Sequence, residues 1–144
     1  SASAHGTTTL TGLDLTAKWK PLDAHQGFPF VAFRAEWIGR DYEFDDAAGG
    51  DDFTVSGWYA QTTWGFTQGW TVGARYDAFS GEDDTVPGLD DRTRWSLALT
   101  YWTSEFAKIR LQVNRDDARA LSGDVTSVCL QFEFNLGKHG AHKF

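Results

Sequence analysis

Methionine is absent from this chain of 144 residues, cysteine occurs once and proline three times. A single cysteine excludes an intramolecular disulfide framework and a zinc site built from several thiolates. There is no continuous apolar run of about 18 residues, so we expect no transmembrane helix. The first residues, SASAHGTTTL, have neither the charged nor the apolar region of an uncleaved signal peptide.

Basic residues are also in deficit. The formal net charge is -7 at pH 7. Phosphate binding needs an excess of Lys and Arg, so the charge argues against nucleic acid as a partner.

Aromatic residues, in contrast, are abundant. They make up 15% of the chain, with 7 Trp and 11 Phe, although the mean hydropathy is -0.41. Large apolar residues in so polar a chain must alternate with polar ones, which is typical of half-buried strands. No segment shows a helical period, so the sequence predicts a single all-β domain over residues 1–144.

The alternation predicts about seven strands. It is clearest near the C-terminus, where Val128, Leu130 and Phe132 alternate with Cys129 and Gln131. A tail, 138–144, follows the last strand. The predicted strands lie near 9–20, 30–42, 54–66, 71–79, 93–102, 107–114 and 127–137.

From the second predicted strand onward the connections alternate in length, whereas the link PLDAHQGFP between the first two strands falls in a short position but is longer and contains Pro. Short connections, TQGW and TSEF, follow the third and fifth predicted strands. Long, acidic, Gly-containing ones follow the second, fourth and sixth: DYEFDDAAGGDD, SGEDDTVPGLDD and RDDARALSGDV. Short turns at one end and long loops at the other are typical of an antiparallel up-and-down transmembrane β-barrel of the outer membrane.

A barrel of this kind assigns the two faces of each strand to water and to lipid. Charged residues face the lumen, since unpaired charges are too costly to bury in a dry core. The predicted lumen-lining residues are Lys18, Arg34, Glu36, Arg75, Asp77, Arg94, Lys108, Arg110 and Glu133. The predicted lipid-facing residues are Leu97, Leu99, Ile109, Leu111, Val113, Leu130, Phe132 and Phe134.

Aromatic residues also gather beside the short connections. Aromatic rings of barrels concentrate at the depth of the lipid headgroups, where their apolar and polar parts are both satisfied. The sequence therefore predicts an aromatic girdle of Trp19, Trp64, Trp70, Tyr101 and Trp102.

Two arrangements are open for the basic residues of the predicted lumen. Arg75, Arg94, Lys108 and Arg110 could form a ladder that steers anions. They could instead form cross-strand pairs with Asp77, Glu36 and Glu133. Pairing is the favoured interpretation.

An odd number of strands poses a question about closure, because bacterial single-chain barrels have an even number. Seven strands alone would leave two unpaired edges in lipid. One interpretation is that the chain is part of a larger barrel, completed by another segment or chain. The other is that one strand escapes detection and the barrel is a complete one of eight strands.

Several segments carry a family resemblance. They are TGLDLTAKWKPL (11–22), GFPFVAFRAEW (27–37), GWTVGARYDAFSG (69–81), DDRTRWSLALTYWTSEFAKIRLQVNRD (90–116) and VCLQFEFNLGKHGAHKF (128–144). Together they resemble the C-terminal part of Gram-negative outer-membrane porin-like proteins. These barrels are related in pattern to phosphate-selective porins and to zinc-regulated TonB-dependent outer-membrane receptors.

The resemblance implies a bacterial outer-membrane location and passive or receptor-linked passage of small solutes. It also implies that Phe144 is the C-terminal assembly signal, read by the barrel-assembly machinery. The chain departs from the usual signal, because Gly140 and His142 stand where apolar residues are usual.

Metal and enzyme functions have little support. His139 and His142 are weak zinc candidates, because two His without further fixed ligands make a poor site. The acidic loops match no EF-hand spacing. No Ser–His–Asp arrangement is present, so we expect neither enzymatic activity nor a cofactor.

The function predicted from the sequence is therefore an outer-membrane channel. The expected partners are the lipid bilayer, lipopolysaccharide, the assembly machinery and a segment or chain that completes the barrel. Two alternatives stay open: a structural barrel that anchors or sheathes a partner held in its lumen, and a soluble lipocalin-like binding barrel.

Overall fold

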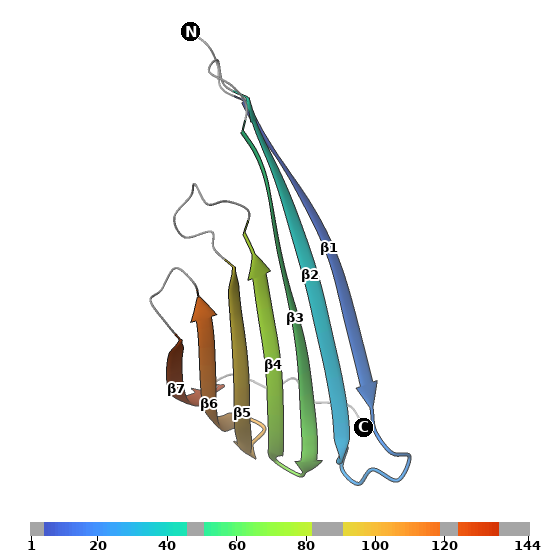
Figure 1. Cartoon of the computed structure of the whole chain (residues 1–144). Helices are drawn as coiled ribbons and strands as arrows, with labels where there is room; N and C mark the ends of the chain where they lie inside the picture. Colours follow the sequence, from blue (N-terminus) through green and yellow to red (C-terminus); the bar gives the residue numbers. More distant parts are fainter. Residues whose placement is uncertain (1–4, 46–50, 82–90, 119–123, 136–144) are drawn as a thin grey trace.

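The protein forms one antiparallel sheet whose seven strands follow each other in sequence order (Figure 1). The computed structural model describes residues 5–45, 51–81, 91–118 and 124–135. Within these residues no helix is long and apolar enough to cross a bilayer. The strands are β1 (His5–Trp19), β2 (Phe30–Asp45), β3 (Asp51–Thr67), β4 (Trp70–Ser80), β5 (Arg92–Ser104), β6 (Ala107–Ala118) and β7 (Val125–Phe134).

The predicted all-β meander of seven strands is confirmed, but several strands are longer than the alternation indicates. β1 begins at His5, β2 reaches Asp45 and β6 reaches Ala118. In the outer part of β1 polar residues occupy both faces, as with Thr7, which lies opposite Glu43, and Thr8 on the other face. Alternation of apolar and polar residues fades there, whereas backbone pairing with the neighbouring strand continues. In Figure 1 β1, β2 and β3 project beyond the other strands at this end.

The short connections lie together at the opposite end of the sheet (Figure 1). Gly69 turns the chain between β3 and β4 with a φ of 78°, a conformation that side chains disfavour. Its carbonyl accepts a hydrogen bond of 2.7 Å from the backbone N–H of Trp102, which ties this turn to β5. In the link between β1 and β2, the backbone N–H of Phe28 donates a hydrogen bond of 3.0 Å to the carbonyl of His25, and the Phe28–Pro29 peptide bond is cis.

The sheet is one layer thick and is not closed in the described residues. β1 pairs with β2 alone and β7 with β6 alone, so these two strands are the edges. Because adjacent strands are antiparallel and the number of strands is odd, the two edge strands run in the same direction. None of the large side chains described is fully buried. The described sheet therefore has two open faces and no enclosed core.

Candidate functional site

The register of the sheet divides the side chains between two faces. In an antiparallel pair, residues directly opposite each other point to the same side. The row Glu36, Tyr59, Asp77, Arg94 and Asp116 therefore shares one face across five strands. All the charged residues predicted to line a lumen lie on this side, which we call the charged face.

The other side, which we call the apolar face, carries the residues predicted to meet lipid. One of its rows joins Val72, Leu99, Leu111 and Leu130 across β4 to β7. The remaining predicted members are on the same side: Leu97, Ile109, Val113, Phe132 and Phe134. The local alternation in each strand and the register between strands thus give the same two faces.

Side chains on the two faces differ in how much solvent they meet. On the charged face Ser96 and Asn114 are each 8% exposed and Thr100 is 3% exposed. On the apolar face Leu97 is 63% and Leu130 is 60% exposed. No second layer covers either side, so crowding within a face must cause the difference. Side chains crowd on the concave side of a curved sheet, and we infer that the charged face is concave.

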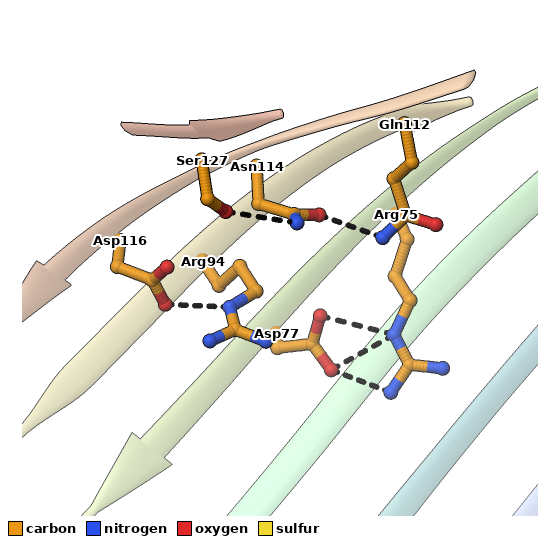
Figure 2. A network of polar contacts seen from close by, with 7 residues as sticks. All are labelled: Arg75, Asp77, Arg94, Gln112, Asn114, Asp116 and Ser127. Carbon is orange, nitrogen blue, oxygen red and sulfur yellow. Dashed lines mark hydrogen bonds and ion pairs between the residues drawn. The ribbon is translucent and has the colours of Figure 1, made fainter. Parts of the chain in front are cut away.

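Arg75 and Asp77, both on β4, form an ion pair on the charged face (Figure 2). Two nitrogens of Arg75 donate hydrogen bonds to Oδ1 of Asp77, Nε at 2.9 Å and Nη2 at 2.5 Å. The guanidinium also lies over the ring of Tyr59, at 3.8 Å from the ring centroid. A planar guanidinium suits both contacts, since it forks onto carboxylates and stacks on rings.

A second group continues across β5, β6 and β7, as Figure 2 shows. Arg94 donates a hydrogen bond of 2.5 Å from Nε to Asp116, its direct partner on β6. Gln112 donates to Asn114 at 2.7 Å, and Asn114 donates to Ser127 at 3.2 Å. Asp116 was missed from the sequence because β6 was predicted to end at residue 114. Gln112, Asn114 and Asp116 recur at every second position, a pattern that indicates that the strand continues to Asp116.

Toward the short connections the charged face is both basic and aromatic. Lys108 forms a salt bridge of 2.8 Å with Glu133, its direct partner on β7. The Lys108 ammonium also lies 5.0 Å from the ring centroid of Trp102. Arg110 donates a hydrogen bond of 3.1 Å to the hydroxyl of Thr100.

Trp102 corrects one prediction. It is the direct partner of Lys108 and so lies on the charged face, opposite to Trp19, Trp64, Trp70 and Tyr101. Its assignment to the aromatic girdle was wrong. Proximity to a short turn suggested the girdle, but the pleat of β5 turns Trp102 away from Tyr101.

The predicted cross-strand pairing is present for Lys108 with Glu133, whereas Arg75 pairs with Asp77 within the same strand, β4. Arg94 pairs with Asp116 instead of an acid considered in the sequence. In the part of the chain that the structure describes, Arg34 and Arg110 have no salt bridge. The basic residues thus form neither a continuous free ladder nor a fully neutralised set.

Hollows lie along the charged face. One hollow of 580 Å³ is lined mainly by residues of the charged face, among them Glu36, Tyr59, Phe79, Arg92 and Asp116. A smaller one of 100 Å³ is lined by Gln61, Gly73, Arg75, Arg110 and hydroxyl side chains, without a carboxylate. A third, of 600 Å³, lies toward the short connections and is lined by Phe28, Phe30, Trp102 and Arg110.

Aromatic residues border the apolar face at both ends. Beside the short connections, Trp70 stacks on Tyr101 with ring centroids 4.5 Å apart, and Trp64 contacts Phe66 at 5.5 Å. Toward the long loops, Tyr76 contacts both Trp58, at 5.3 Å, and Trp95, at 4.5 Å. The sequence indicated only the first group. The signal for the second was that Trp58 and Trp95 stand where the apolar alternation ends on β3 and β5.

No group of three or more His, Cys, Asp or Glu side chains suited to a metal occurs among residues 5–45, 51–81, 91–118 and 124–135. The weak zinc candidates His139 and His142 and the predicted assembly residue Phe144 lie outside the described residues.

A pair of substitutions tests the electrostatics of the charged face. We expect Asp77→Asn to lower the free energy of unfolding by about 0.5–1 kcal/mol at low salt, because it removes the partner of Arg75 at a partly solvated site. The loss should shrink as salt screens the pair. Denaturant unfolding in micelles at two salt concentrations measures both effects.

Asp14→Asn is the matched control. Asp14 lies directly opposite Glu36 and has no salt bridge in the described part of the sheet. Like charges in this position repel, so the variant should be unchanged or slightly more stable. Equal losses for the two variants would contradict the assigned pairing.

Comparison with known proteins finds one distant relative and no family. An uncharacterized protein of Aquifex aeolicus (strain VF5) is 29% identical over 157 aligned residues, which cover 96% of this chain and 31% of that protein. The chain thus spans about a third of the length of the relative it matches. No family model matches the chain, and no solved structure matches it. The function must therefore be argued from the two faces of the sheet.

Proposed function

We propose that this chain forms part of the wall of a bacterial outer-membrane β-barrel through which small solutes pass. The observation that carries the proposal is the distribution of side chains: the exposed face is apolar, and the crowded face is charged and hydrogen-bonded. A soluble barrel has the opposite arrangement, with its apolar residues enclosed. Lipid against the apolar face would satisfy these residues without a covering layer.

Water inside the barrel is the natural environment of the charged face. Arg34, Arg110 and Glu36 have no salt bridge within the described residues, and charges of this kind are too costly for a dry interior. The hollows along this face would form part of the solute path. The tight turns between β3 and β4 and between β5 and β6 share one end of the sheet, as the short periplasmic turns of outer-membrane barrels do, although the link between β1 and β2 at that end is longer.

Closure of the wall requires more than the described strands. β1 and β7 run in the same direction, so an antiparallel barrel needs an odd number of further strands between them. We propose that these belong to the same, longer polypeptide, which is consistent with the greater length of the Aquifex relative.

Purification and bilayer recording test this function. We expect the protein to stay folded and monodisperse only in detergent or lipid, because the apolar face would otherwise drive aggregation. After reconstitution in a planar bilayer, it should produce stepwise increases in conductance. A folded, monodisperse protein without detergent would contradict the membrane proposal and favour a soluble binding barrel. Insertion without conductance would contradict the channel and favour a structural barrel.

A further inference from the structure

The apolar band runs obliquely across the sheet at its long-loop edge. On the apolar face, the band begins at Leu13 on β1 but only at Val128 on β7. These residues are not in the same row, because Val128 lies in the row of Ala17. In the row of Leu15, the side chains are apolar or aromatic on β1 to β5 and polar on β6 and β7: Leu15, Ala35, Ala60, Tyr76, Trp95, Arg115 and Thr126.

The other edge of the band shifts by the same amount. On β1 the band ends at Trp19, whose row reaches Leu130 on β7. β7 continues past this row with two more apolar-face residues, Phe132 and Phe134. The band therefore keeps the same length on both edge strands, from Leu13 to Trp19 and from Val128 to Phe134, while moving toward the short connections.

The shift defines an angle. Val128 is offset from Leu13 by two same-face repeats, or about 14 Å along the strands. The spacings between the first and seventh strands add up to about 29 Å across the sheet. The boundary stays in the row of Leu13 from β1 to Ala78 on β4 and shifts by two repeats between β4 and β6; averaged over the seven strands, this offset is inclined to the rows by about 25°. The four same-face residues from Leu13 to Trp19 span about 20 Å along the strand, or about 18 Å along an axis inclined by that angle, which fits within the apolar band of about 25 Å of outer-membrane barrels.

We infer that the apolar face contacts the hydrocarbon core of a bilayer with its strands tilted by about 25° from the membrane normal. The inference rests on the proposed membrane function and adds the position of the bilayer on the sheet. One interface passes near Trp58, Tyr76 and Trp95, and the other passes near Trp19, Trp70 and Tyr101, so that both boundaries carry aromatic rings. Residues of the same row lie at different depths on β1 and β7.

Depth-dependent quenching tests the tilt. Single-Cys variants Leu15→Cys, Thr126→Cys, Trp19→Cys and Leu130→Cys are made in a Cys129→Ser background and labelled with a thiol-reactive fluorophore. The protein that contains this chain is reconstituted into phosphatidylcholine vesicles with bromine at the middle of the acyl chains. The labels at 15 and 126 share one row, and those at 19 and 130 share another.

The two pairs of labels are expected to show opposite orders of quenching between β1 and β7. The label at 15 should be quenched strongly and the label at 126 little, because 126 lies outside the band on β7. The label at 130 should be quenched more than the label at 19, which lies at the interface. Equal quenching within each pair would overturn the tilt while leaving membrane insertion intact. Absence of quenching at all four positions would overturn the membrane proposal itself.

Discussion

Leu111→Arg is expected to lower the free energy of unfolding of the bilayer-inserted protein by about 2–4 kcal/mol, the cost of an arginine on the lipid face near the bilayer centre. Leu111 lies on the apolar face between Leu99 on β5 and Leu130 on β7, and it is 46% exposed in the isolated sheet. A guanidinium there would have no carboxylate in its row, and neither protein nor water would replace its hydration. Denaturant unfolding in lipid vesicles measures the loss.

Gln112→Arg is the control, since Gln112 is the next residue on β6 and faces the opposite side. The substitution removes one hydrogen bond of 2.7 Å from Gln112 to Asn114, so the free energy of unfolding should fall by at most about 1 kcal/mol. The new guanidinium would reach water and the polar groups of the charged face. If both variants lost the same free energy, the assignment of one face to lipid and the other to water would be wrong.

Gly65→Ala has the second-largest expected effect. The ring of Phe30, the direct partner of Gly65 on β2, occupies the space where a side chain would be. A Cβ at Gly65 would lie 2.2 Å from the nearest ring atom of Phe30. The ring has limited freedom to move, because the Lys18 ammonium lies 4.8 Å from its centroid and the Phe28 ring lies 5.4 Å away. We expect a loss of about 1–3 kcal/mol, as for other overpacked sites.

Two further variants separate this clash from a general intolerance of alanine. Gly57 is on the same strand and face, but a Cβ there would meet only ordinary contacts, the nearest at 3.6 Å. Gly57→Ala should be neutral or stabilising by up to about 1 kcal/mol, because glycine loses more backbone entropy on folding. In a Phe30→Ala background, Gly65→Ala should lose most of its effect, and equilibrium unfolding of the four-member cycle measures the coupling. Additive losses would contradict the contact.

Trp102 and Asp116 show where sequence reasoning failed although the signal was present. The alternation of β5 puts Tyr101 on the apolar face and therefore Trp102 on the other, yet its closeness to a turn was given more weight. The alternation of β6 continues through Asn114 to Asp116, yet the strand was ended where acidic residues begin. In both cases the two-residue period of the strand predicts the observed position better than closeness to a turn or an acidic loop does.

The slant of the apolar band has a different origin, because no single strand contains it. Each strand shows only its own apolar stretch, such as Leu13–Trp19 on β1. The offset between β1 and β7 is the sum of registers across six strand pairs, and register depends on turn geometry and backbone pairing. The same is true of the contacts of Tyr76 with Trp58 and Trp95, which need three neighbouring strands in register.

The sequence by itself determined the all-β antiparallel meander, the order of the strands and the face that most side chains occupy. These properties follow from the pleat, which sends alternate residues to opposite sides and can be read within one strand. Only the tertiary structure decided where the strands end, that Arg94 pairs with Asp116, that Phe30 covers Gly65 and how the apolar band crosses the sheet. Each of these depends on which residues of two neighbouring strands stand opposite each other, and hydrogen bonding between distant parts of the backbone sets that register.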